Sequence, residues 1–179
     1  MIFGVLGKVL KVSSLVDVGF GSGGWPRCAA LYGADPVVGI DGPWNQNEFP
    51  ELGVHLRYLD LSVGGWSDKF RSEFEKVDLA VCLEVAEHLP ERAAAALVQD
   101  LTKVSDAVCF GAAIVGQDGT LHLNERPQSF WAELFNEQSF VAFDIFRSDL
   151  WNDEEVAPYY VQNTLLYVRR EADLERYLK

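Results

Sequence analysis

The chain has 179 residues, with 15 Lys and Arg against 27 Asp and Glu, and a formal net charge of −12 at pH 7. This charge disfavours a long nucleic acid as a partner, because a phosphate backbone binds to a positive field. No apolar run approaches the ~20 residues that cross a bilayer, so we expect no membrane insertion. The length predicts a single domain over residues 1–179.

The N-terminal stretch is apolar, but Lys8 and Lys11 interrupt it and no small-residue cleavage site follows. We interpret it as a short leading segment before the first strand, not as a signal peptide. The three cysteines are far apart and odd in number, which is typical of reduced thiols. Together these features predict a cytoplasmic protein.

Short apolar runs alternate with helix-like stretches along the chain. Strands are predicted at 14–20, 36–41, 54–60, 76–84, 106–115, 140–146 and 159–168, and helices at 24–34, 90–105 and 126–140. The first five runs are nearly continuous in hydrophobicity, as strands covered on both faces are. The alternation predicts an α/β fold, a doubly wound and mostly parallel seven-stranded sheet with an antiparallel last strand. We expect the acidic segment 147–158 to be a loop between the last two strands.

A glycine-rich turn follows the first predicted strand, in the segment LVDVGFGSGG. Gly19, Gly21 and Gly24 fit the G-x-G-x-x-G pattern of dinucleotide-binding turns, and Asp41 ends the next strand, where an acid can bind ribose hydroxyls. This part of the pattern fits an NAD-dependent reductase or epimerase as well. It also fits a turn that serves only tight packing of a strand on a helix.

Two further acids favour a cationic ligand at this turn. Asp17 precedes the first glycine by two residues and completes D-x-G-x-G-x-G with Gly19, Gly21 and Gly23. A carboxylate there attracts the sulfonium and ammonium of S-adenosylmethionine (SAM), whereas it would repel a pyrophosphate. Asp60 ends the third strand, where it can accept from an adenine amino group, with Leu61 against the ring.

These motifs, together with the segment EVAEHLP after the fourth strand, resemble class I SAM-dependent methyltransferases over nearly the whole chain. The resemblance implies a Rossmann-like methyltransferase fold and transferase activity. It implies that the glycines approach the methionyl part of SAM, that Asp41 holds the ribose, and that Asp60 and Leu61 hold the adenine. The strand end from Cys82 to Glu84 would line the methionyl side. The N-terminal lid is short, so closure is expected from the 116–130 loop, the 146–158 loop or a second subunit of a homodimer.

The EVAEH segment places Glu84, Glu87 and His88 at i, i+3 and i+4, so on a helical turn they share one face. His122 follows the neighbouring strand and is expected at the same mouth. Two carboxylates and two imidazoles make a site for a divalent ion such as Mg²⁺ or Mn²⁺. The pattern also resembles metal-dependent 2′-O-methyltransferases, in which a metal acidifies neighbouring hydroxyls.

Two readings of this cluster do without a metal. His88 or His122 can act as a general base, because an imidazole titrates near neutral pH. Alternatively, Glu84 lines the cofactor pocket and His88 only packs the following helix. If the cluster binds a metal or supplies a general base, the candidate catalytic residues are His88, His122 and Glu84.

The C-terminal third is rich in aromatic and amide side chains, which suit stacking on sugars and hydrogen bonding to hydroxyls. The candidate substrate contacts are Asn124, Glu125, Arg147, Trp151 and Tyr160. We expect O-methylation of a small sugar, nucleoside or secondary metabolite. The alternatives are the reductase or epimerase above and a non-catalytic partner subunit that keeps the methyltransferase fold.

Overall fold

The computed structural model describes residues 2–48 and 52–172. The strands are β1 Leu15–Val18, β2 Val37–Asp41, β3 His55–Tyr58, β4 Leu79–Leu83, β5 Ala107–Gly111, β6 Phe140–Phe143 and β7 Leu165–Arg169. The helices are α1 Ile2–Val9, α2 Gly24–Leu31, α3 Trp66–Glu73, α4 Ala94–Val104, α5 Gln128–Glu137, α6 Arg147–Leu150 and α7 Pro158–Asn163. Short 3₁₀ turns, η2 Ala86–His88 and η3 Glu91–Ala93, connect β4 to α4.

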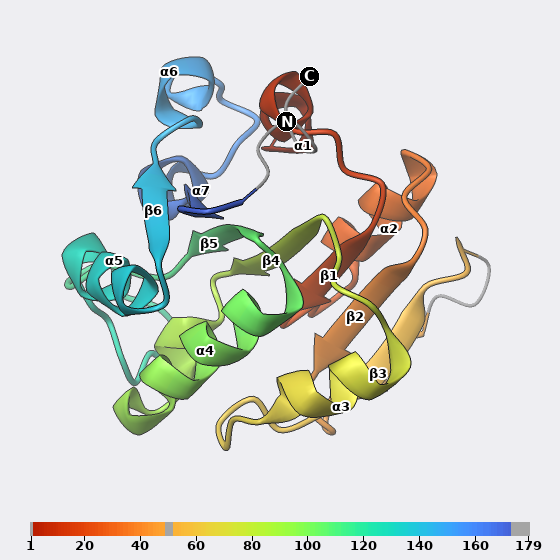
Figure 1. The fold of residues 1–179 in the computed structure, drawn as a ribbon. Coiled ribbons are helices and arrows are strands. Elements are labelled where there is room, and N and C mark those ends of the chain that lie inside the picture. Colours follow the sequence, from red (N-terminus) through yellow and green to blue (C-terminus); the bar gives the residue numbers. More distant parts are fainter. Residues whose placement is uncertain (1, 49–51, 173–179) are drawn as a thin grey trace.

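The strands form one seven-stranded sheet in the order β3-β2-β1-β4-β5-β7-β6. The pairs among β1 to β5 are parallel, and β7 runs antiparallel to both β5 and β6. The chain order reverses between β1 and β4, which is the place where ligands bind in such sheets. The predicted fold class is therefore confirmed, including the antiparallel last strand (Figure 1).

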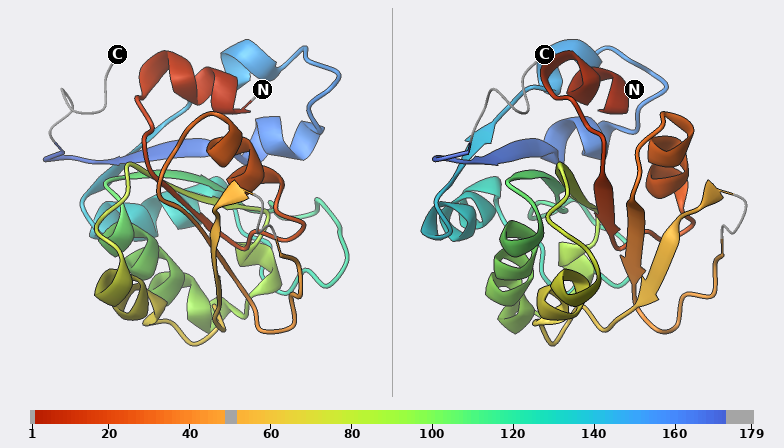
Figure 2. Two further views of the ribbon diagram at one scale, coloured as in Figure 1. Left: turned by 90° about the vertical axis from the view of Figure 1, so that its right-hand side faces the viewer. Right: turned by 45° about the vertical axis from the view of Figure 1, so that its right-hand side comes forward.

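Helices cover both faces of the twisted sheet (Figures 1 and 2). Alternate strand residues such as Val16, Val38 and Ala80 belong to one core with α3, α4 and α5. Their neighbours Leu15 and Val37 belong to a second core with α1, α2 and the α6–α7 region. This division explains why the central strands β1, β2, β4 and β5 are apolar at nearly every position.

The structure differs from the sequence-based prediction at four places. The leading segment contains α1, because Ile2, Val5 and Leu6 at helical spacing bury against the second core despite two glycines. Helix α3 was missed; its residues are mostly polar, and Trp66 and Phe70 supply its buried contacts. The expected strand at 159–168 begins as α7 and becomes β7 only at Leu165. The expected loop 147–158 contains α6.

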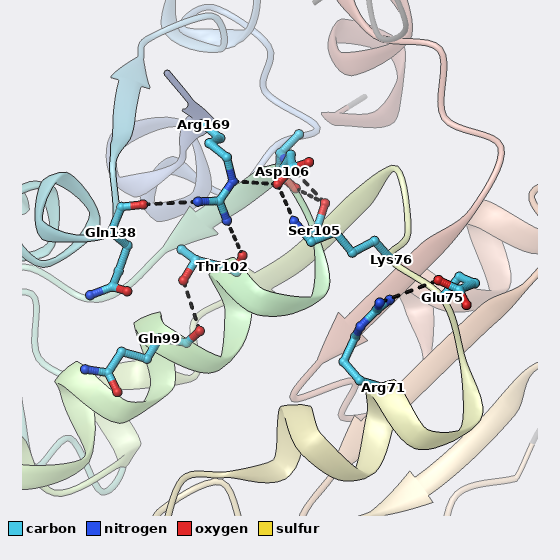
Figure 3. A network of polar contacts seen from close by, with 10 residues as sticks. Arg71, Glu75, Lys76, Gln99, Thr102, Ser105, Asp106, Gln138 and Arg169 are labelled. Atoms are coloured by element: carbon cyan, nitrogen blue, oxygen red, sulfur yellow. Dashed lines mark hydrogen bonds and ion pairs between the residues drawn. The ribbon is translucent and has the colours of Figure 1, made fainter. Parts of the chain in front are cut away.

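A polar network fixes β7 in the sheet, on the side of α4 and α5 (Figure 3). The Arg169 guanidinium donates to the Asp106 carboxylate at 2.6 Å and to the Thr102 carbonyl at 2.6 Å, and it lies 4.6 Å from the Phe140 ring centroid. Lys76 also donates to Asp106, at 2.7 Å. Burial opposes ionisation of Asp106, but the hydrogen bonds and charges of Lys76 and Arg169 outweigh it and lower its pKa. None of the described helices has the length and apolar character of a membrane span.

Candidate functional site

The glycine turn lies at the carboxyl end of β1, directly against the loop that follows β4. Gly19 has φ +83°, and a Cβ built on it would come within 2.3 Å of Val85 Cγ2. Both the backbone conformation and the close approach therefore require glycine at this position. The turn leads into α2, whose N-terminal N–H groups have no helical partners.

A cavity of about 690 Å³ opens between this turn, the end of β2 and the loop after β4. Its lining includes Gly19, Gly21, Asp41, Asp60, Leu61, Glu84 and His88. Such a volume suits a nucleoside-sized ligand. The structure thus brings most of the predicted cofactor residues to one cavity, whereas Cys82 is fully buried in β4 and Gly23 is buried in the turn.

Asp41 ends β2 with its carboxylate turned to the glycine turn. It accepts from the Gly21 amide at 2.7 Å, from the Gly42 amide at 2.6 Å and from the Asn45 side chain at 2.8 Å. Asn45 and Asn47 also donate to the Gly21 carbonyl, each at 2.8 Å. These two asparagines hold the turn in place, and sequence reasoning missed them because nothing but their polarity after Asp41 marks them.

The opposite wall of the cavity carries Asp60 and Leu61. Asp60 is exposed and accepts from the Ser62 amide at 2.9 Å, and hydrogen bonding by Ser62 lowers the pKa of this carboxyl. Leu61 is buried and also lines the cavity. Trp44 also lines the cavity, and its ring lies so close to Gly42 that a Cβ there would be 2.1 Å from it.

Asp17 is buried in β1, two residues before the first glycine, and is only 1% exposed. Neither of its carboxylate oxygens has a hydrogen-bond partner. Burial, together with the charge of Asp41, raises the pKa of Asp17 well above its ordinary value. A buried acid without a partner costs folding free energy, so a cationic ligand at the turn would offset that cost.

The Glu84, Glu87 and His88 side chains do not share one helical face, which corrects the expectation. The helical turn is only η2, Ala86–His88, and Glu84 precedes it with φ +56°. Ligand atoms of Glu87, His88 and His122 lie within 4.8 Å of one another; Glu84 is not in this group. Among the described residues, the candidate metal centre therefore has three members.

Glu87 is fully buried, and neither carboxylate oxygen has a hydrogen-bond partner of normal geometry. Burial raises the pKa of Glu87 to about 7; the charge of Glu84 adds to this, and nearby backbone amides and His122 partly offset it. The imidazoles of His88 and His122 lie with ring centroids 5.0 Å apart. An unpartnered carboxylate beside two imidazoles is a donor set that suits a divalent cation.

A neighbouring carboxylate orients His122. Its Nδ1 lies 3.0 Å from Glu125 Oε1, and Glu125 in turn accepts from the Gly116 amide at 2.8 Å. The hydrogen bond to His122 lowers the pKa of Glu125, and the Gly116 amide adds to this. With Nδ1 engaged, Nε2 is the nitrogen left to bind a metal or accept a proton, as is usual for metal-binding histidines.

The other predicted substrate residues are spread over the molecule. Asn124 is buried and accepts from Arg126 at 2.9 Å. Arg147 forms an ion pair with Asp144 and donates to the Gln128 side chain and the Gln162 carbonyl. Trp151 is 67% exposed and lines a separate cavity of about 590 Å³ between α6 and α7.

Tyr160 is the predicted substrate residue that borders the glycine turn. It lines a second cavity of about 510 Å³ with Ser22, Trp25, Cys28 and Glu84. The Trp25 and Tyr160 rings meet edge to face with centroids 5.6 Å apart. Gly19, Gly21 and Glu84 line both cavities, so the two cavities adjoin at these residues.

No protein-family model and no curated protein sequence matches the chain. An O-methyltransferase family protein from Burkholderia thailandensis is similar in structure, with a TM-score of 0.67 and 13% identity over 95% of this chain and 53% of that chain. The small RNA methyltransferase HEN1 has a TM-score of 0.62 and 16% identity, and the match covers 96% of this chain and 25% of that chain. The magnesium protoporphyrin IX methyltransferase ChlM from Synechocystis PCC 6803, with bound S-adenosylhomocysteine (SAH), has a TM-score of 0.59 and 17% identity. The match covers 94% of this chain and 77% of that chain.

These likenesses define the fold as that of the class I SAM-dependent methyltransferases. The chain spans about half the length of the Burkholderia protein, 53%, and a quarter of HEN1, 25%.

Proposed function

We propose that the chain is a SAM-dependent methyltransferase that methylates a hydroxyl of a small acceptor, with a divalent cation at Glu87, His88 and His122. The observation that best supports this proposal is the cavity at the switch point of the sheet. It joins a glycine turn and two carboxylates, Asp41 and Asp60, at the positions where a nucleoside cofactor needs them.

The residues present fit SAM by shape and charge. Val85 excludes a Cβ at Gly19, so the turn presents bare backbone to the cavity, and the buried Asp17 carboxyl two residues earlier has no hydrogen-bond partner. Asp41 has lone pairs beyond its three hydrogen bonds and would accept from a ribose hydroxyl. Asp60 would accept from the adenine amino group, with Leu61 and Trp44 against the ring. SAM supplies the methyl group on a sulfonium.

The metal proposal rests on Glu87. A fully buried carboxylate without a partner, beside two imidazoles, is costly unless a cation joins them. A divalent cation, Mg²⁺ or Mn²⁺, supplies positive charge that acidifies nearby hydroxyl groups. His122, oriented by Glu125, would hold its Nε2 toward that position. Without a metal, the same nitrogen would accept the proton of the acceptor hydroxyl.

The acceptor is proposed to be a small sugar, nucleoside or other polyhydroxy metabolite. Its position would be the junction where Glu84 lines both cavities, between the Trp25 and Tyr160 rings on one side and His88 of the cofactor cavity on the other. Aromatic rings there suit stacking on an aromatic group or on the C–H face of a sugar. The chain's contribution to methyl transfer would then be alignment of acceptor and cofactor, since attack on a methyl group depends on proximity.

The test is isothermal titration calorimetry with SAM, before and after chelator treatment, together with metal analysis of the purified protein. We expect SAM binding, about one divalent ion per chain, and loss of that ion in His88→Ala and His122→Ala. Asp41→Ala should weaken SAM binding while leaving metal content unchanged.

The alternatives give different results in the same experiment. Tight NAD binding with no SAM binding would mean a nicotinamide-dependent enzyme. SAM binding without a metal would keep the methyltransferase proposal and give His122 the role of a base. A non-catalytic partner subunit would be indicated if activity appeared only with a second protein.

A further inference from the structure

Glu84 has an unusual place in the site. It is a non-glycine residue with φ +56°, a strained conformation that persists only where its surroundings enforce it. Its amide donates to the Gly111 carbonyl at 2.9 Å, which ties the strained residue to β5. Glu84 lines both adjoining cavities, so this residue forms part of the wall between them.

Two amide side chains hold this carboxylate. Gln117 donates to Glu84 Oε2 at 3.1 Å, and Asn163 donates to Glu84 Oε1 at 3.1 Å. Asn163 also donates to Gln117 Oε1 at 2.8 Å, so the three side chains form a closed triangle. Gln117 comes from the loop after β5, and Asn163 ends α7, which means that three distant segments meet here.

The partners of Glu84 are neutral, and this decides what the triangle can bind. No Lys or Arg lines either cavity among the described residues. A half-buried carboxylate with only amide partners keeps its negative charge uncompensated. The Trp25 and Tyr160 rings border it in the second cavity, and aromatic faces also attract cations.

We propose that Gln117 and Asn163 are positioning residues that hold the Glu84 carboxylate at the junction of the two cavities, where it binds a ligand ammonium group. This rests on the proposed function. The ammonium has two sources, the methionyl part of the cofactor or an amine on the acceptor. The sequence also predicted Glu84 as a metal ligand. In the structure its carboxylate accepts from Gln117 and Asn163 and does not belong to the cluster of Glu87, His88 and His122.

Calorimetry with two nucleosides tests the first source. SAH carries the ammonium, and 5′-methylthioadenosine has the same adenosine without the amino-acid part. We expect Gln117→Ala, Asn163→Ala and Glu84→Gln each to weaken SAH binding about five- to tenfold. Binding of 5′-methylthioadenosine should stay within about twofold of wild type. The double variant Gln117→Ala/Glu84→Gln should lose no more than Glu84→Gln alone, because the residues act as one unit.

Phenethylamine tests the second source, because its cation and ring match Glu84 and the Trp25–Tyr160 wall. If SAH binding is unchanged but Glu84→Gln and Gln117→Ala lose phenethylamine binding to the SAH-saturated protein, the ammonium belongs to the acceptor. The proposal is overturned if the variants change the binding of neither SAH nor phenethylamine. It is also overturned if they weaken the binding of SAH and of 5′-methylthioadenosine equally. Wild-type protein that binds neither nucleoside contradicts the proposed function itself.

Two controls keep the result interpretable. Asn136→Ala removes an exposed amide that accepts from Arg170 on the far end of α5, and it should leave every ligand unaffected. Asn163 is only 3% exposed, so its variant can lose stability. Gln117 is partly exposed in a loop, and Gln117→Ala decides the question if Asn163→Ala does not fold.

Discussion

Asp17 and Glu87 are buried acids that the fold leaves without hydrogen-bond partners. Groups of this kind destabilise a protein that has no ligand and strengthen the binding of a cation that reaches them. In a protein of marginal stability, such a cost marks a site where selection favours binding over folding. Asp17 lies near the carboxyl end of β1 and Glu87 lies in η2, after the carboxyl end of β4, so the two acids flank the switch point.

We predict that metal-free and SAM-free protein loses stability as the pH rises from 4.5 to about 7, the ordinary and folded-state pKa values of Glu87. In this window folded Glu87 holds a proton that the unfolded chain has released, so its contribution is complete below the window and lost above it. Urea unfolding at about pH 5 and about pH 8 measures the effect. Glu87→Gln should reduce the pH-dependent loss by about 1–3 kcal/mol.

Asp17, whose pKa is also raised, works in the same direction and leaves a residual pH dependence in Glu87→Gln. The control is Glu133→Gln, which alters an exposed carboxylate of α5 and should keep the wild-type pH dependence. Glu87→Gln with a wild-type profile would show that Glu87 is not the titrating group.

A second prediction concerns the carboxylate behind His122. Glu125→Gln should lower the affinity for Mn²⁺ about 10- to 100-fold although no metal ligand is removed, because a glutamine at this position no longer fixes the tautomer of the His122 imidazole. His122→Ala should abolish metal binding. Competition with a metal-sensitive dye measures both, and equal affinities for wild type and Glu125→Gln would contradict this account of the hydrogen bond.

The glycine turn and the β4 loop form one packed unit, which Gly19→Ala tests. A Cβ at Gly19 meets Val85 Cγ2 at 2.3 Å in addition to its positive φ, whereas Gly33 has φ +87° and open space around it. We expect Gly33→Ala to cost about 1 kcal/mol and Gly19→Ala about 2–4 kcal/mol, with loss of SAM binding in the latter alone. Thermal unfolding compares them, and equal losses would mean that the β4 loop moves freely.

The Arg169 network makes a parallel prediction for β7. Arg169→Ala should destabilise the protein by about 1–3 kcal/mol, because the Asp106 carboxylate and the Thr102 carbonyl lose a donor. Arg170→Ala, which removes an exposed contact to Asn136, should cost less than about 0.5 kcal/mol. Denaturant unfolding separates the two, and similar values would show that the network adds nothing to stability.

Strands were predictable from sequence where both faces are buried. The β1, β2, β4 and β5 segments are apolar at nearly every position, and the structure places them together in the middle of the sheet. Helix α7 was not predictable in this way, because Tyr159, Tyr160 and Val161 read equally well as a short strand. Helix α1 was hidden by Gly4 and Gly7, and only tertiary packing against the second core stabilises it.

The candidate site also contains residues that the sequence could predict and residues that it could not. Gly19, Asp41 and Asp60 could be located because each follows a recognisable strand. Gln117 and Asn163 could not, because they approach Glu84 from 33 and 79 residues away along the chain. The separation of Glu84 from Glu87 and His88 was equally hidden, since the i, i+3, i+4 spacing is informative only where the backbone is helical.

The charge of the molecule limits its partners. With a net charge of −12 and no Lys or Arg on the walls of the two adjoining cavities as described, we predict no binding of a single-stranded RNA oligonucleotide at physiological salt. Fluorescence anisotropy measures this. Micromolar binding that weakens steeply with salt would contradict it and bring the function closer to that named for HEN1.

The position of β7 has a consequence for how the protein is made. Among the described strands β7 comes last along the chain, yet it lies between β5 and β6, which do not pair with each other. Until residue 169 is synthesised, both older strands present unpaired backbone groups that can bind other chains. The nascent chain is therefore open to aggregation along these two strand edges until β7 has been made, and this one antiparallel strand then pairs with both.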